Sequence, residues 1–220
     1  MTLLIWWSGL LNAQNIVEIQ FHPDFAGEVL SIGEAIENTD GQISQIDLFR
    51  LYISGVSLFD GTETVYQEVQ SFHLLDAEEL NSLRIQLQTE AGLSFTHIGF
   101  KIGIDSLTSV SGAMGGDLDP TLGMYWTWQS GYVNFKLEGI APKCPARHHR
   151  FQYHIGGYQF PFNTLQEVRL PVLNREKVDI QIAIDRLFQS IDMQTTYLVM
   201  SPNQAAVTLS RKLPALFSIQ

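Results

Sequence analysis

Regular alternation of apolar and polar side chains is the feature that most restricts how this chain can fold. Between Val178 and Ile184 the apolar residues fall at every second position, and Asp179, Gln181 and Ala183 stand between them. Because successive side chains of a strand point to opposite faces, this pattern predicts a half-buried strand. Similar runs, each bounded by Gly, Pro, Asn or Asp, occupy 16–22, 46–53, 65–75, 83–88, 96–104, 132–138, 151–155 and 166–170. Many short strands predict an all-β fold, a two-sheet β-sandwich of the immunoglobulin-like (Ig-like) kind.

Helical signals are sparse in the same sequence. The segment 76–83 is predicted to form one or two turns, and 120–128 could begin as a helix. The best helical signal is 201–213, which opens with Ser201 as a cap and Pro202 at the first helical position. We therefore expect one or two short helices, including one near the C-terminus.

Length and charge limit the class of protein. A chain of 220 residues fits one large β domain, and we expect residues 14–220 to form it. The formal net charge of −10 is spread along the chain, so nucleic acid is not an expected partner, whereas cations are attracted. The apolar segment 1–13 resembles an export signal without its basic start, or else a hydrophobic N-terminal strand. We expect a periplasmic or secreted protein whose mature chain does not insert into a membrane.

The single cysteine and the six histidines limit the possible metal sites. With Cys144 as the one cysteine, the chain can form no internal disulfide, and sites rich in cysteine are excluded. Histidine is then the natural ligand, because copper and zinc both bind neutral imidazole. His73 and His154 each stand at a predicted strand end, directly before a turn, where β-sandwich sites gather. The other interpretation is two unrelated histidines that are hydrogen-bonded to turn backbones.

Other candidate ligands have simpler explanations. His22 falls on the polar side of its strand, which is typical of a surface residue, although it is a possible additional ligand. Asp105 and Asp117 could offer oxygen ligands to a metal such as calcium, but helix caps and turns also account for them. The His148–His149 pair lies in a basic loop, where we expect incidental metal binding only.

Aromatic residues are concentrated in one short stretch near the middle of the chain. Tyr125, Trp126, Trp128, Tyr132 and Phe135 fall close together and are interleaved with glycines that allow close approach. We interpret this block as the centre of a functional site, in which tyrosines surround the two tryptophans. The simpler interpretation is a stacked pair of structural tryptophans.

The same block carries a resemblance to a known family. The segments KIGIDS, SGAMGG and LDP between positions 101 and 120, followed by GMYWTWQSGY and KLEG, resemble the MbnP-like family. The segments LYIS, SFHLLD and YHIGG fit the same pattern, so the resemblance spans most of the chain, and WTW at 126–128 is its most specific part. Members of this family are exported copper-binding proteins associated with methanobactin operons.

The resemblance implies a β-sandwich that holds copper outside the cytoplasm and is not an enzyme. It also implies a partner, a dihaem cytochrome c peroxidase-like enzyme of the MauG type, which oxidises a tryptophan to kynurenine. Carried onto this sequence, the modified ring is Trp126 or Trp128, and the imidazole ligands are His73 and His154. The aniline nitrogen and the carbonyl of the product could approach the copper or tune its affinity from nearby.

A second class of function fits the same residues without a metal. Exposed Trp and Tyr side chains can stack on a sugar or a peptide, so the chain could be a secreted, metal-free binding module. A copper oxidoreductase is a third interpretation, but no general acid–base pair accompanies the histidines in the sequence. Loss of ligand binding in a Trp126→Ala variant, with metal content irrelevant, would distinguish the binding module.

Overall fold

The structure is a computed structural model that describes residues 14–36, 43–129, 131–172 and 175–220. The segment 1–13, interpreted above as an export signal, lies outside the described residues. None of the helices that the described residues form is both long enough and apolar enough to span a membrane.

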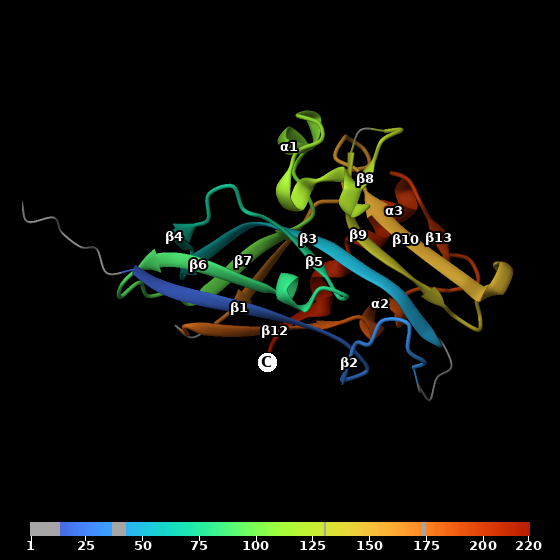
Figure 1. The fold of residues 1–220 in the computed structure, drawn as a ribbon, viewed down its shortest axis with the longest axis horizontal. Helices are drawn as coiled ribbons and strands as arrows, with labels where there is room; N and C mark the ends of the chain where they lie inside the picture. Colours follow the sequence, from blue (N-terminus) through green and yellow to red (C-terminus); the bar gives the residue numbers. More distant parts are fainter. Residues whose placement is uncertain (1–13, 37–42, 130, 173–174) are drawn as a thin grey trace, which may run out of the picture.

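The described residues form two β-sheets, called sheet A and sheet B below (Figure 1). Sheet A contains, in spatial order, β14 (Phe217–Ile219), β12 (Lys177–Ala183), β1 (Gln14–Phe25) and β2 (Glu28–Val29), with β6 (Arg84–Glu90) also paired to β1. Sheet B contains, in order, β11 (Gln166–Pro171), β7 (His97–Ile102), β3 (Gln45–Asp60), β9 (Gly131–Ile140), β10 (Arg150–Gly156) and β13 (Leu198–Val199). On sheet B, β4 (Glu63–Gln67) and β5 (Phe72–Asp76) pair with β3, and β8 (Tyr125–Trp126) pairs with β9.

Both sheets mix parallel and antiparallel pairs. The pairs β1–β12 and β10–β13 are parallel, whereas β1–β6 and β3–β9 are antiparallel. The predicted mainly β, two-sheet fold is therefore confirmed. The Ig-like arrangement is not shown, because that arrangement is built from two antiparallel sheets.

Sheet B buries apolar side chains on both of its faces. Leu51 and Ile53 of β3 point into the main core, which they share with Ile19 and Phe21 of sheet A. Tyr52, between them, points the other way and belongs to a second, smaller cluster of buried residues. We call the face that carries Tyr52 the outer face. In Figure 1 the segments around α1 and β8 lie on one side of β3, and β1 and β12 lie on the other.

The short helices agree with the sequence in part. The C-terminal helix is confirmed as α3 (Gln204–Ser210), but the cap predicted at Ser201 is wrong. Asn203 is the cap, because its side chain accepts a hydrogen bond from the Ala206 amide at 2.9 Å. The remaining helical segments are α1 (Ser106–Val110), α2 (Asp185–Phe188) and the 3₁₀ turns η1 (Leu80–Leu83), η2 (Gly116–Leu118), η3 (Pro120–Leu122), η4 (Arg147–His149) and η5 (Leu213–Leu216).

The structure defines three predicted elements more closely. Of the one or two turns expected over 76–83, the structure has the single turn η1, and the segment 120–128 begins as the turn η3 and continues as β8. The strand expected over 65–75 is two strands, β4 and β5. They are separated because the backbone turns at Gln70, which has a positive φ of 52°.

Candidate functional site

The aromatic block is divided between the two faces of sheet B. Trp126 and Tyr132 belong to the outer-face cluster, and Tyr125 packs against it. The rings of Tyr125 and Tyr132 meet edge to face with their centroids 5.0 Å apart. Phe135 lies in the main core on the opposite face, so it is not part of this cluster. The site is thus built from β8 and the first residues of β9.

Two tyrosine hydroxyls hold the loop that covers the cluster. Tyr52 donates to the Asp117 carbonyl at 2.9 Å, and Tyr132 donates to the Leu118 carbonyl at 3.2 Å. Tyr132 also accepts from the Met114 amide at 3.1 Å. Burial raises the pKa of Tyr52, with neighbouring Tyr132 and Asp117 adding to the effect, so its hydroxyl stays protonated as a donor. These tyrosines therefore act as anchors of the covering loop.

The two tryptophans differ sharply in exposure. Trp126 is 8% exposed and Trp128 is 65% exposed, and their ring centroids lie 5.8 Å apart. The buried ring of Trp126 rests on β10 at Gly156. A Cβ added to Gly156 would lie 2.7 Å from Trp126 Cζ3 and 2.5 Å from the Tyr132 carbonyl oxygen, so only glycine fits there. An exposed indole thus packs, tilted by 46°, against a buried one that rests on the sheet.

His154 lies on β10 two residues before Gly156, on the same face of the strand, about 7 Å along it. Its imidazole is buried, and Nε2 donates to Glu138 Oε1 at 2.8 Å. Gln152 Nε2 donates to the other oxygen of Glu138 at 2.9 Å, and Lys136 Nζ lies 3.9 Å from Oε1. A carboxylate held by three neighbours therefore fixes the orientation of the imidazole.

Two charged groups beside His154, Glu138 and Lys136, have pKa values below their ordinary ones. The hydrogen bond from His154 lowers the pKa of Glu138 to about 2; burial opposes this effect, while Gln152 and Lys136 add to it. Burial lowers the pKa of Lys136, and nearby Arg50 adds to that effect, whereas Glu138 opposes it. Glu138 therefore remains a carboxylate at neutral pH and a possible oxygen ligand.

His73 lies elsewhere on the same sheet. It is the second residue of β5, not the last residue of a strand as expected, and its Nε2 donates to Glu68 Oε2 at 2.7 Å. Ser71 donates to the same oxygen at 2.5 Å. Hydrogen bonds from His73 and Ser71 lower the pKa of Glu68, although burial, the largest single influence, opposes them. This group ties the β4–β5 turn together.

The pairing of strands places His73 and His154 on opposite faces of sheet B. His73 pairs with Ile53, whose side chain points into the main core. His154 pairs with Lys136, which pairs with Arg50, and Arg50 is three residues from Ile53 along β3. Since alternate residues point to opposite faces, the two imidazoles diverge, and their strands are separated by three strand spacings, about 14 Å. The structure does not bring them together.

The other predicted ligands are dispersed. His22 Nε2 lies 2.8 Å from Asp179 Oδ1 on sheet A. Asp105 caps α1 by accepting from the Thr108 amide at 2.8 Å, and Asp117 accepts from the Leu74 amide at 3.0 Å. Asp105 thus has the capping role that the sequence offered as its simpler explanation, whereas Asp117 ties the covering loop to Leu74 of β5.

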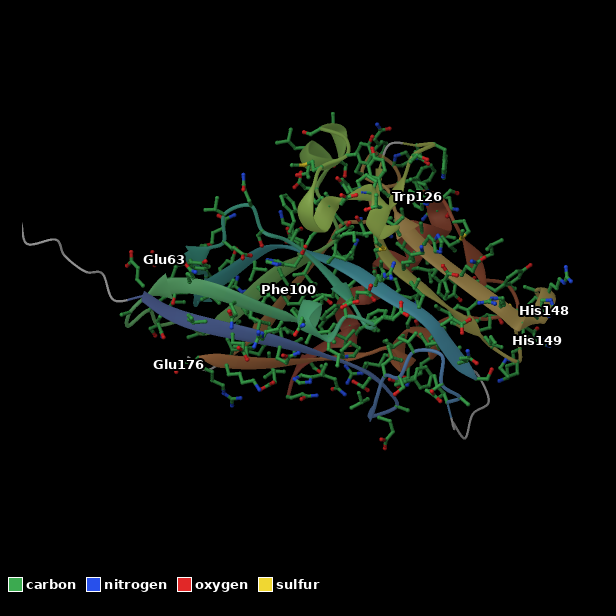
Figure 2. The ribbon with its side chains drawn as sticks, viewed as in Figure 1. Glu63, Phe100, Trp126, His148, His149 and Glu176 are labelled. Atoms are coloured by element: carbon green, nitrogen blue, oxygen red, sulfur yellow. The ribbon has the colours of Figure 1, made fainter. Side chains whose placement is uncertain are left out.

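The basic loop lies far from the tryptophans, at the opposite end of β10 from Trp126 (Figure 2). Cys144 is 1% exposed and its thiol donates to the Arg150 carbonyl at 3.2 Å. His148 and His149 are exposed, with positive φ values of 58° and 56°. The thiol is therefore turned inward while His148 and His149 lie on the surface.

A cavity of about 210 Å³ adjoins Trp126, and neither His154 nor Glu138 lines it. Its wall includes Tyr158, Phe160 and Phe162, and Gly157 of the YHIGG segment. Phe160 is 96% exposed. The sequence analysis missed these aromatic residues because they follow the last strand of the block and show no alternation.

The described residues offer an incomplete set of metal ligands. They contain no group of three or more His, Cys, Asp or Glu side chains close enough to hold one ion. At the tryptophans the chain supplies one imidazole, His154, and one carboxylate, Glu138. A copper ion bound there needs further donors besides these two.

Glu138 and Lys136 are site residues that the sequence analysis did not select. A signal was present, since Lys136 and Glu138 alternate with Phe135 and Leu137, so the two polar residues share a face. Their approach to His154 depends on the pairing of β9 with β10, which alternation within one strand does not reveal.

Comparison with known proteins identifies the family. The family model described as MbnP matches residues 14–204. The solved structure of MbnP from Methylosinus trichosporium superposes with a TM-score of 0.61 at 14% sequence identity, covering 86% of this chain and 81% of that one. No curated protein sequence matches the chain. With a family model spanning most of its length and a shared fold, this chain belongs to the MbnP family.

Proposed function

We propose that the protein is an exported copper-binding protein that sequesters or delivers copper, and that it is not an enzyme. The proposal rests on membership of the MbnP family and on the properties that the sequence resemblance implies for that family. It includes a single domain over residues 14–220 in the periplasm or outside the cell. An acidic chain with a net charge of −10 favours capture of a cation.

One observation carries the location of the copper site. His154 and the ring of Trp126 lie on the same face of β10, with Glu138 hydrogen-bonded to the imidazole. Imidazole is a ligand that copper binds strongly, and a carboxylate that orients it is common around metal sites. We therefore place the site at His154, beside Trp126 and Trp128.

The incomplete donor set gives the tryptophans a role. A dihaem MauG-type partner would oxidise one of them to kynurenine, whose aniline nitrogen and carbonyl add donors next to His154. Trp128 is the ring that an external oxidant reaches first, because it is 65% exposed, and its ring packs against Trp126. Oxidation at this surface requires no entry into the main core.

In this proposal His73 does not bind the same copper ion as His154, although the sequence resemblance implied that the two histidines act together. Because it faces the opposite side of sheet B, it can bind copper only as a second, separate site in this arrangement. The matched substitutions His154→Ala and His73→Ala distinguish these roles.

The test measures copper retained after dialysis against a chelator, using protein from its own host. We expect His154→Ala to lose the bound copper and His73→Ala to keep it. The two variants are matched, because each removes one imidazole that is paired with a glutamate. Retention by His154→Ala equal to wild type would refute the site. Peptide mass mapping of the same samples shows whether a tryptophan has been converted.

The cavity beside Trp126 favours a second candidate function, a secreted module that binds a sugar or a peptide without metal. Its aromatic wall and its volume of about 210 Å³ suit a small ring or side chain. Phe160→Ala removes an exposed wall residue without touching His154 or Glu138. A binding module loses its ligand in this variant, whereas a copper protein keeps its metal.

A further inference from the structure

A second cavity, of about 490 Å³, lies on sheet A and takes no part in the proposed copper site. Its lining includes Gln20, His22 and Asp24, which alternate along β1 with core residues and therefore share the face turned away from the main core. The wall is completed by polar Gln181 and by apolar residues from β2 and η1.

Asp24 is the unusual group in this cavity. The residue is 6% exposed, and its Oδ1 accepts a hydrogen bond from the Gly27 amide at 3.1 Å across the β1–β2 turn. Its Oδ2 is buried and has no hydrogen-bond partner among the described residues. A buried carboxylate oxygen without a donor is costly, so its position next to a cavity calls for a donor from outside the chain.

Two neighbouring side-chain donors, those of Gln20 and His22, are already engaged. Gln20 Nε2 donates to the carbonyls of Phe21 and Leu83 at 3.2 and 3.1 Å. His22 Nε2 is paired with Asp179 at 2.8 Å. No lysine or arginine occurs among the described lining residues, so the cavity that Asp24 lines has no positive side chain.

The rim of the cavity is apolar. Val29 on β2 and Leu80 on η1 line it and are 84% and 74% exposed. A ligand suited to this cavity joins a hydrogen-bond donor, for the carboxylate, to a short apolar part, for the rim.

We propose that this cavity binds a small primary amine, with its ammonium group donating to Asp24 Oδ2 and its alkyl part lying against Val29 and Leu80. A metal ion is a poorer occupant, since no group of three or more metal-ligating side chains is found among the described residues. An ammonium needs only acceptors, and the charge of −10 on the protein favours a cation.

The experiment is an NMR titration of the ¹⁵N-labelled protein with n-pentylammonium chloride, with n-pentanol as the neutral analogue. We expect saturable shifts of the amides of Asp24 to Val29 with the amine and none with the alcohol. In Asp24→Asn the Oδ1 atom can still accept from the Gly27 amide, and an NH₂ donor takes the place of the Oδ2 acceptor. This substitution should weaken binding about 10- to 100-fold, the loss expected for one charge-assisted hydrogen bond.

The matched control is Glu28→Gln, which removes an exposed carboxylate from the same hairpin without changing the cavity lining. It should bind the amine as the wild type does. Equal affinity for amine and alcohol, no saturable shift, or unchanged binding by Asp24→Asn would each overturn the proposal. Tighter binding of a blocked lysine, Nα-acetyl-lysine methylamide, would also overturn it, because the occupant would then be a lysine of a partner protein.

Discussion

Glu138 has the clearest electrostatic signature at the residue scale. Its pKa is lowered from 4.5 to about 2, chiefly by the hydrogen bond from His154. A carboxyl whose folded pKa is depressed contributes stability above its unfolded pKa, and that contribution is lost as the pH falls through the folded value. The stabilisation by Glu138 is therefore present above pH 4.5 and is lost between pH 4.5 and about 2.

This behaviour predicts the effect of Glu138→Gln. The variant should be about 1–2 kcal/mol less stable than wild type at pH 7, because a charge-assisted hydrogen bond is weakened. The difference should shrink as the pH is lowered from 4.5 toward 2. Urea unfolding at a series of pH values measures this, with Glu63→Gln, at an exposed site on β4, as the control. A difference that stays constant across the acid range would contradict the assignment.

At the same scale, the sequence offers His154 and the two tryptophans as candidate site residues, but it does not give their arrangement. Alternation along β10 predicts that Gly156 shares a face with His154, but the β9–β10 register shifts between Ile155 and Gly156, so the contact of Gly156 with Trp126 is seen only in the structure. Whether His73 shares that face depends on the register of β5, β3, β9 and β10, which is set by pairing across four segments distant in sequence. That register cannot be derived from local pattern.

Among the elements, β8 and β10 are held in contact by the packing of Trp126 on Gly156. Gly156→Ala should force Trp126 away from the strand and destabilise the protein by about 1–3 kcal/mol, the usual cost of overpacking. Urea unfolding measures the loss, and acrylamide quenching should show greater access to tryptophan. Gly115→Ala is the matched control, because an added Cβ there meets no atom within 4 Å. Equal stability of the two variants would show that the contact is not tight.

The start of α3 offers a test of an observed cap against a predicted one. Asn203→Ala should lower stability by about 1 kcal/mol, since the Ala206 amide loses its acceptor. Ser201→Ala, which removes the cap predicted from the sequence, should leave the free energy of unfolding unchanged. Thermal unfolding of both variants decides the matter, and the reverse ranking would restore the sequence-based helix start.

The long strands were predictable because burial on one face imposes alternation over many residues. The strands β2, β8 and β13 were not predicted, since each has two residues and no period can be recognised in so short a segment. The segment 120–128 begins as the 3₁₀ turn η3 and does not continue as a helix. Its Asp119 cap is real, but Gly123 adopts a positive φ of 74° and ends the turn before the aromatic strand.

At the scale of the whole molecule, the central feature is that the two faces of sheet B carry different sets of buried residues. The face of sheet B toward sheet A carries the main core, and the outer face carries the aromatic cluster, His154 and Glu138. The amine cavity proposed above lies on sheet A, so the two proposed sites can be tested independently. In the proposed account, copper at the outer face would bind without contact with the main core.

The most direct test of the proposed copper site is paramagnetic broadening by Cu²⁺ of the NMR signals of ¹⁵N-labelled protein produced in its own host. We predict that the first signals to broaden are the amides of His154 to Gly156 and the indole N–H groups of Trp126 and Trp128. First broadening instead at the exposed His148–His149 loop, or around His22 on sheet A, would contradict the account.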